Sequence, residues 1–568
     1  MSVEPLDRAL RERVFAWLDP RWIVHEDEDV VAIDKPSGVP TQEAREGAAD
    51  DLPTRLARFL EQRDGVDEAY VGIHQRLDKD TSGVVLYAKS RAANGELAPQ
   101  FTQHTVRKIY LACVDGWRHG ARATFRDQIG PLRGGRVEIV KTGGKHAITH
   151  ASVIERRGSR ALLEITIETG RTHQIRAQLA HHGSPIAGDR VYAGAPAPRL
   201  MLHASRLELV HPRWERPFGV SAPPPRALDA WMDGRAIAFD DALEMAVQRR
   251  FALGRAALRD PDARTTAFRL MNEAGDGAPG VAIDLYADWA LLHTYDESID
   301  EGAVARALDG LGVRGVYVKR RPRQANVMDD VARTEFAPHE PVIGAAAPEE
   351  FVVREHGMRF LVRLGDGMST GLFLDQREHR ARVRAASAGA RVLNLFSYTC
   401  GFTVAAVAGG AVSSTSVDAS GVALDRGRAN LNLAGADRAA HRTVRADVFE
   451  WLARAAKRGE QFDLVCCDPP TYSTAKGRTG KTQRWSSGKQ WRALAAACLR
   501  VLAPGGTLLA TSNDRRMTQR ALRAEVHEGA RDAGIELASL RDLGPPEDFP
   551  FAPEEGPHLK GVLGVRAS

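Results

Sequence analysis

The chain has 568 residues, of which 27% are charged and 43% hydrophobic, and its formal net charge is +5. This length exceeds what one hydrophobic core supports, and no apolar run approaches the roughly 20 residues of a membrane span. The five cysteines form no Cys-x-x-Cys pair and no cluster with zinc spacing. We therefore expect a cytoplasmic multidomain protein with reduced thiols, no metal site and no membrane partner.

The first part of the chain is predicted to be rich in strands. Short apolar runs bounded by turn residues indicate strands at 29–34, 84–88, 108–114 and 161–167. Pro223-Pro224-Pro225 then predicts a domain end, because proline lacks a backbone donor and cannot lie inside a helix or a central strand. We expect a mixed-sheet domain over residues 1–230.

The remainder is expected to form two more domains. A helical pattern at 242–258 and a strand at 280–284 indicate a small α+β domain over 235–345, and the Ala/Pro/Glu-rich run 345–350 suggests its end. Short apolar strands at 392–396, 416–418, 462–467 and 507–510 alternate with helical stretches. That alternation predicts a doubly wound, Rossmann-like α/β domain over 350–568.

The segment His74-Gln75-Arg76-Leu77-Asp78-Lys79-Asp80-Thr81-Ser82-Gly83 places one carboxylate, Asp78, beside an arginine and a Thr-Ser-Gly turn. A lone aspartate in a turn is usually a cap. Here two further segments accompany it, Lys108-Ile109-Tyr110-Leu111-Ala112 and Thr169-Gly170-Arg171-Thr172-His173-Gln174-Ile175-Arg176, followed by Gly183 to Asp189. Together, in this order, they resemble the motifs of RluA-type pseudouridine synthases over about residues 22–220.

The resemblance implies roles for five residues. Asp78 would be the nucleophile of uridine isomerisation, Tyr110 would pack on the target base, and Arg176 would pair with Asp78. Arg76 would fill the gap left by the flipped base, and with Arg171 would contact RNA. This half would need no cofactor, and whether Asp78 attacks the base or the sugar stays open.

A second site is predicted at the carboxyl ends of the later strands. The run Val392 to Phe402 is a strand, a tight turn and the start of a helix, which brings backbone donors to a ligand. Asp418 ends the next strand, where a carboxylate can accept ribose hydroxyls, and Asp447 and Asp468 end the two after it. No Gly-x-Gly-x-x-Gly is present, which disfavours a dinucleotide oxidoreductase.

This pattern is similar to class I S-adenosylmethionine methyltransferases of the RlmI/RlmKL class, which act on 23S ribosomal RNA, over about residues 240–568. The resemblance implies S-adenosylmethionine as cofactor. Its binding residues would be Phe396, Tyr398, Cys400, Gly401, Asp418, Asp447 and Asp468, with Asp468 also catalytic. Cys400 stands where the family usually has glycine.

The methylated atom is predicted from a missing cysteine. Methylation of cytosine at C5 needs a cysteine that adds to the ring, and the stretch Thr511 to Arg516, where carbon-methylating members carry it, has none. This stretch resembles the member that methylates guanine at N7. We therefore expect guanine N7, with cytosine C5 as the alternative.

Two basic segments bear on RNA binding. Residues 476–492 interleave lysine and arginine with tryptophan, so Arg484 and Trp485 could bind single-stranded RNA; a solvated loop with Trp491 in the core is equally compatible. Lys319-Arg320-Arg321-Pro322-Arg323 is expected to be merely solvated.

The sequence thus predicts a bifunctional enzyme of 23S ribosomal RNA. The alternatives are an enzyme of transfer RNA, and an RNA-binding ribosome-assembly factor with one inactive site. The oligomeric state stays open.

Overall fold

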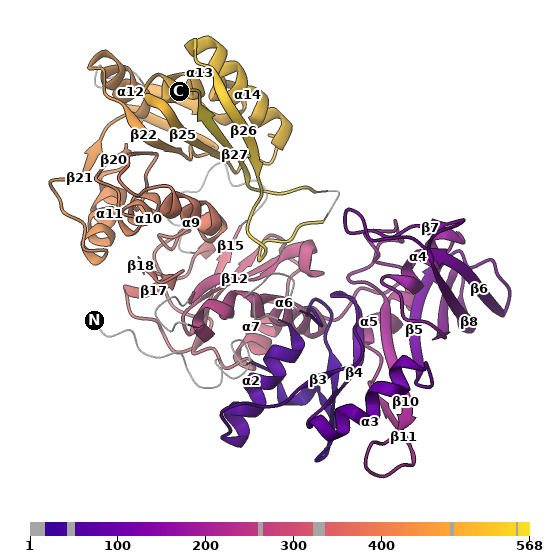
Figure 1. Ribbon diagram of the computed structural model, residues 1–568. Helices are drawn as coiled ribbons and strands as arrows, with labels where there is room; N and C mark the ends of the chain where they lie inside the picture. The colour runs from indigo at the N-terminus through magenta and orange to yellow at the C-terminus, as the bar shows by residue number, and fades with distance from the viewer. Residues whose placement is uncertain (1–16, 43–50, 260–264, 322–334, 477–481, 553–554) are drawn as a thin grey trace. The chain divides into compact units, whose positions relative to one another are not determined.

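The computed structural model describes residues 17–42, 51–259, 265–321, 335–476, 482–552 and 555–568, with the backbone alone at 251–259 and 472–489 (Figure 1). Its contacts divide the chain into two compact units, Arg8–Arg255 and Ala256–Ser568. Both contain helices and sheets, so the expectation of a multidomain mixed α/β protein is confirmed. None of the helices in the described ranges is both long and apolar enough to cross a membrane.

The first unit is built on one mixed sheet of order β1-β2-β4-β10-β5-β9-β8-β6-β7, to which β3 and β11 are added at β4 and β10. Most neighbours are antiparallel, but β4 and β10 pair in parallel. The strands are β1 Ile23–Glu26, β2 Val30–Lys35, β3 Gly72–Ile73, β4 Ser82–Ala88, β5 Arg107–Asp115, β6 Arg122–Ile129, β7 Ile139–Val140, β8 Lys145–Arg157, β9 Arg160–Ile167, β10 Leu202–Val210 and β11 Pro217–Ser221. The helices are η1 Pro20–Trp22, α2 Leu52–Asp64, α3 Arg91–Thr102, α4 Gln174–His181, α5 Arg226–Asp233 and α6 Phe239–Arg259.

Strand β4 is buried along its whole length because both faces of the sheet are covered. Val85 and Tyr87 lie in one hydrophobic core with Leu56 of α2, while Val84 and Leu86 lie in a second core that includes residues of α3. Since successive side chains of a strand point to opposite faces, this continuous apolar run is what a doubly covered strand requires.

The first unit continues past the three prolines that were expected to end it. Helix α5 follows them directly, and its Leu228, Trp231 and Met232 belong to the same core as β4. A boundary at residue 230 would therefore fall inside α5. The prolines end strand pairing but not the unit, because the apolar face of the next helix still packs on that core.

The described residues of the second unit form two sheets and two hairpins. A mixed sheet has the order β12-β13-β14-β15-β16, and a larger one has the order β21-β20-β19-β22-β25-β27-β26, in which β27 and β26 are antiparallel and the others parallel. The strands are β12 Ala267–Asn272, β13 Val281–Tyr286, β14 Trp289–Thr294, β15 Gly315–Arg320, β16 Ile343–Gly344, β17 Phe351–Glu355, β18 Met358–Val362, β19 Arg391–Leu395, β20 Ser413–Asp418, β21 His441–Arg445, β22 Phe462–Cys467, β23 Tyr472–Lys476, β24 Thr482–Ser486, β25 Leu502–Ser512, β26 Leu537–Leu543 and β27 Lys560–Arg566. The helices are η3 Glu273–Asp276, α7 Glu301–Asp309, η4 Leu374–Gln376, α9 Arg377–Ala385, α10 Gly401–Ala408, α11 Gly421–Leu433, α12 Val448–Lys457, α13 Ser487–Arg500 and α14 Gln519–Ala533.

One hydrophobic core joins the parts that were expected to be separate domains. Trp289 and Tyr317 of the smaller sheet lie in the same core as Phe360 of the β17–β18 hairpin and Val392 of the larger sheet. Residues 256–568 therefore form one unit, because a boundary near 345–350 would divide a shared core.

Candidate active sites

Asp78 lies in the segment between β3 and β4, and the side chain of Lys35 holds the backbone of this segment. The fully buried ammonium of Lys35 donates to the carbonyls of Pro36, Val39 and Lys79 at 2.8–2.9 Å. Burial lowers the pKa of Lys35 to about 7. Lys35 thus holds the backbone next to Asp78 through these carbonyl groups.

Glycine is required at Gly83, the last residue of the motif. Its φ is +113°, and an added Cβ would lie 2.2 Å from the carbonyl oxygen of Ala204. Here β4 meets β10 in parallel. A side chain would separate these strands, so the glycine allows the close approach that positions the Asp78 segment.

Arg176 joins Asp78 to a second, fully buried carboxylate. Its Nη1 donates to Asp78 at 3.0 Å, and its Nε and Nη2 donate to Asp189 at 2.7 and 2.9 Å. Asp189 also accepts from the backbone nitrogens of Val191 and Tyr192. The predicted ion pair forms, and Asp189 is a member of it that was quoted with the motif but given no role.

His173 is a further neighbour that the motif analysis missed. Its Nε2 lies 3.9 Å from Asp78, its Nδ1 lies 3.2 Å from the Tyr192 hydroxyl, and its φ is +52°. Burial lowers the pKa of His173, which favours the neutral ring beside the ionised pair. An αL histidine just before a helix gives no periodic signal, so spacing alone could not have identified it.

The residues predicted for the first site line one cavity of about 550 Å³. Asp78 is 23% exposed, while the side chain of Tyr110 is buried, and burial raises the pKa of its hydroxyl so that it stays protonated. The lining includes Arg76, Lys108, Tyr110, Ile167, Arg171 and Leu202. A carboxylate, an aromatic ring and peripheral cations therefore face one space large enough for a nucleotide.

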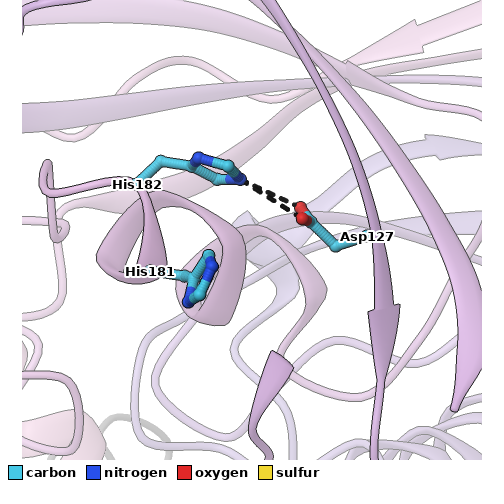
Figure 2. A group of neighbouring side chains, drawn as sticks. All are labelled: Asp127, His181 and His182. Carbon is cyan, nitrogen blue, oxygen red and sulfur yellow. Dashed lines mark hydrogen bonds and ion pairs between the residues drawn. The ribbon is translucent and has the colours of Figure 1, made fainter. Parts of the chain in front are cut away.

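Helix α4, which carries Arg176, is anchored at its other end by the group drawn in Figure 2. Asp127, His181 and His182 each offer one side-chain atom, a carboxylate oxygen or a ring nitrogen, that could bind a metal ion, and these atoms lie within 4.8 Å of one another. His182 bonds the Asp127 carboxylate at 3.2–3.3 Å, and Gln178 donates to it at 2.7 Å. None of these residues lines the cavity. These bonds connect the C-terminal end of α4 to β6.

In the second unit, three residues of the turn between β19 and α10 have a left-handed backbone. Phe396, Tyr398 and Cys400 have φ of +54°, +47° and +63°. The conformation at Cys400 explains why glycine suits this position, and the strain is on the order of 1 kcal/mol. The Cys400 thiol is fully buried, and a Cβ added at Gly427 of α11 would lie 2.5 Å from its Sγ. Cys400 therefore packs under the turn and points away from the ligand side.

The carboxylates expected to bind the cofactor lie at the ends of neighbouring strands. Asp418 accepts from the backbone nitrogens of Tyr398 and Ser420, both at 2.8 Å, which joins the turn to the end of β20. A carboxylate has about four acceptor positions, so two remain for ribose hydroxyls. Asp447 caps α12 by accepting from Glu450. The turn, its backbone donors and these acids fit S-adenosylmethionine.

Asp468 follows the last residue of β22, and its pKa departs furthest from the ordinary value among the acids of this site. Burial raises its pKa to about 7, although the Thr511 hydroxyl donates to it at 2.6 Å. A carboxyl that is partly protonated near neutrality can donate or accept a hydrogen bond. This chemistry suits a group that positions an acceptor base.

The predicted RNA contacts of Arg484 and Trp485 lie outside the described side chains. Their backbone belongs to the β23–β24 hairpin. Trp491, by contrast, is buried in the core of the larger sheet, as the alternative for this segment proposed.

Comparison with known proteins matches both halves. Residues 29–181 match the RNA pseudouridylate synthase family, and residues 283–563 match the S-adenosylmethionine-dependent methyltransferase family. YwbD of Bacillus subtilis is 33% identical over 306 residues, covering 53% of this chain and 74% of that protein. Ribosomal RNA large subunit methyltransferase I of Aeromonas salmonicida is 33% identical over 305 residues, with coverages of 53% and 75%. The crystal structure of SMU.776 with SAH has a TM-score of 0.49 and 27% identity, and covers 61% of this chain and 85% of that one.

The guanine-N7 prediction is not supported by these relatives. It relied on the missing cysteine in residues 511–516 and on a resemblance of that stretch to one guanine-methylating member. The relatives instead carry the names ribosomal RNA large subunit methyltransferase I and putative ribosomal RNA large subunit methyltransferase, and neither name refers to guanine. A short stretch such as 511–516 cannot outweigh similarity over about 300 residues. The predicted fusion and its cofactor are confirmed: the chain belongs to the S-adenosylmethionine-dependent methyltransferase family and carries an RNA pseudouridylate synthase domain ahead of its methyltransferase domain.

Proposed function

We propose that this chain makes two modifications in the RNA of the large ribosomal subunit, 23S ribosomal RNA: one pseudouridine and one methylated base. The observation that carries the proposal is the presence of two separate sets of acids, each built within its own unit. The names of the curated relatives support the large-subunit substrate. We also propose that, within the single unit 256–568, the part before the 345–350 run binds the RNA substrate and the part from residue 350 onward binds the cofactor.

In the first site, the proposed roles follow from the contacts of Asp78. Isomerisation breaks the bond between the sugar C1′ and N1 and forms one between C1′ and C5; the proton lost from C5 is balanced by one gained at N1. Asp78 acts as the nucleophile, and Arg176 keeps it ionised and oriented. Tyr110 packs on the uracil while it is detached, and Arg76 and Arg171 contact RNA. The cycle consumes no other reactant.

In the second site, the residues bind and orient. S-adenosylmethionine, when bound, supplies an electrophilic methyl group. Phe396, Tyr398, Cys400 and Gly401 form the turn against it, with Asp418 and Asp447 as hydrogen-bond acceptors. Asp468 positions the acceptor base, and the transfer then depends on proximity and alignment.

The test compares ribosomal RNA from a strain that lacks the gene with RNA from its parent. Pseudouridines are mapped by carbodiimide modification, and methylated bases are mapped by mass spectrometry of nuclease fragments. We expect one pseudouridine and one base methyl group to be missing from 23S RNA, and the purified protein to restore both. Loss confined to transfer RNA, or no loss in any RNA, would show the proposed substrate to be wrong.

A further inference from the structure

A large cavity in the described part of the second unit lies outside the cofactor turn. It measures about 750 Å³ and is lined by residues of strands β12, β13 and β14, by residues within 368–375, and by residues 549–551 and 555–558. Its volume is within the range of about 300–1,000 Å³ that is usual for ligand pockets. The residues that line it are spread over nearly 300 positions of the sequence, so no short motif predicted it.

Aromatic rings in this cavity are exposed to solvent. Phe373 is 48% exposed and Phe551 is 36% exposed, and both line the cavity together with Tyr295. An exposed phenylalanine face loses the burial that would stabilise it. Such faces are the usual stacking surface for an unpaired base.

The cation Arg321 also lines the cavity, and a buried chain of polar groups orients it. Its Nε donates to Nδ1 of His293 at 3.1 Å, and its Nη2 donates to the carbonyl of Met368 at 3.1 Å. His293 in turn bonds Asp284 at 2.8 Å, and Asp284 pairs with Arg269. The run Lys319 to Arg321 is therefore not the merely solvated patch that was expected: Lys319 is fully buried and Arg321 is held in place.

The protonation states of these linked polar side chains are set by their surroundings. Burial lowers the pKa of His293 to about 4, so its ring is neutral at pH 7. With Nδ1 accepting from Arg321, the ring proton lies on Nε2 and is donated to Asp284. Although burial opposes it, the charge of Arg269 holds the pKa of Asp284 below its usual range. Near neutral pH the hydrogen bond from Arg321 to His293 therefore persists, and the Arg321 guanidinium keeps one orientation.

The cavity adjoins the cofactor site. The Tyr398 hydroxyl lies 2.8 Å from the Ser369 hydroxyl, and the Tyr398 ring lies 5.3 Å from that of Phe373. On the other side, the Asn513 side chain accepts from Thr471, which follows Asp468-Pro469-Pro470. One end of the cavity therefore reaches the residues proposed to hold the methyl donor.

We propose that this cavity receives a nucleotide flipped out of the RNA, with its base stacked on Phe551 and Phe373 and its phosphate paired with Arg321. His293, Asp284 and Arg269 are positioning residues that act through Arg321. This inference rests on the proposed methylation of RNA. It adds where the acceptor nucleotide binds and which side chains bind it.

The experiment uses the full chain with SAM affinity, KM for 23S RNA and kcat measured for each variant. F551L removes the ring face and F551W retains it, while R321M removes the charge. R523M, in an exposed ion pair on α14 away from the cavity, is the matched control for loss of an arginine. We expect F551L to raise KM for RNA by about 10-fold or more, since base stacking contributes at this level. F551W should keep the wild-type KM for RNA, and R321M should raise this KM as F551L does. All variants should bind SAM with the affinity of wild type.

A second measurement does not depend on methyl transfer. 2-Aminopurine riboside monophosphate is titrated with wild type and variants in the presence of SAM, and stacking is followed as fluorescence quenching. We expect the quenching to be lost in F551L and R321M, and retained in F551W and R523M.

Quenching that is equal in wild type, F551L and R321M would overturn the inference, as would equal KM values. A loss of SAM affinity in both variants would overturn it too, because the cavity would then belong to the cofactor site. Failure of the proposed function has another signature: wild type would transfer no methyl group to 23S RNA while the variant-dependent quenching remained.

Discussion

Asp189 holds the guanidinium of Arg176 with two hydrogen bonds of 2.7 and 2.9 Å, and this leaves only Nη1 directed at Asp78. The side chain of Asp189 is fully buried and that of Arg176 is 7% exposed. Removing one charge of such a pair leaves the other uncompensated. The orientation of the proposed nucleophile therefore depends on a carboxylate that cannot itself reach the substrate.

We predict that D189N lowers both the stability and the pseudouridine-forming activity of the first unit. The free energy of unfolding should fall by on the order of 3 kcal/mol, because Arg176 loses its buried partner. Urea denaturation and a pseudouridine assay measure the two effects. D67N, at an exposed position of the same unit, is the control; equal behaviour of the two variants would contradict the role given to Asp189.

D78N should abolish pseudouridine formation while methyl transfer continues at the wild-type rate. Asparagine has nearly the same shape but cannot act as the carboxylate nucleophile. Both products are quantified from the same reaction by mass spectrometry, with D67N again as control. Pseudouridine at the wild-type level in folded D78N would refute the assignment.

The buried thiols are predicted to take no part in methyl transfer. Cys466 and Cys467 lie on opposite faces of β22 in two different cores, and burial raises the pKa of both. Burial also raises the pKa of Cys400 to about 11. Single replacement by alanine should cost about 0.5–3 kcal/mol of stability and leave transfer measurable. Complete loss of transfer in one folded variant would identify that thiol as a nucleophile.

Asp468 should make stability depend on pH in a defined window. Its folded pKa of about 7 is above the ordinary 3.8, so between these values the folded state binds the extra proton and stability falls as pH rises. D468N removes this penalty. The gain in urea midpoint of D468N over wild type should therefore be larger at pH 8 than at pH 5, and an equal gain would contradict the raised pKa.

A fragment of residues 1–255 should fold and form pseudouridine alone, whereas residues 1–230 should be less stable. The shorter fragment cuts α5 before Trp231 and Met232, and it lacks the buried Ala242, Leu243 and Ala246 of α6. Thermal unfolding and the pseudouridine assay compare the two. If activity in the longer fragment required addition of residues 256–568, the units would not be independent.

The sequence alone predicted the main candidate residues of each site, because the chemistry of each is concentrated in short segments. Asp78, Tyr110 and Arg176 line one cavity, and Tyr398, Asp418 and Asp468 follow or end neighbouring strands. Alternation of apolar strands and helices likewise predicted the parallel part of the larger sheet, since each element leaves a local pattern.

Only the tertiary structure decided where the units end and what surrounds the sites. The packing of α5 on the first core and the core shared between Trp289 and Val392 are contacts between distant segments, which no local pattern encodes. The same holds for Arg321, which lies in a basic run that the sequence predicted to be solvated. In the structure Arg321 donates to His293, and His293 bonds Asp284. Burial of charge is decided by the partners that folding brings together, and these lie far apart along the chain.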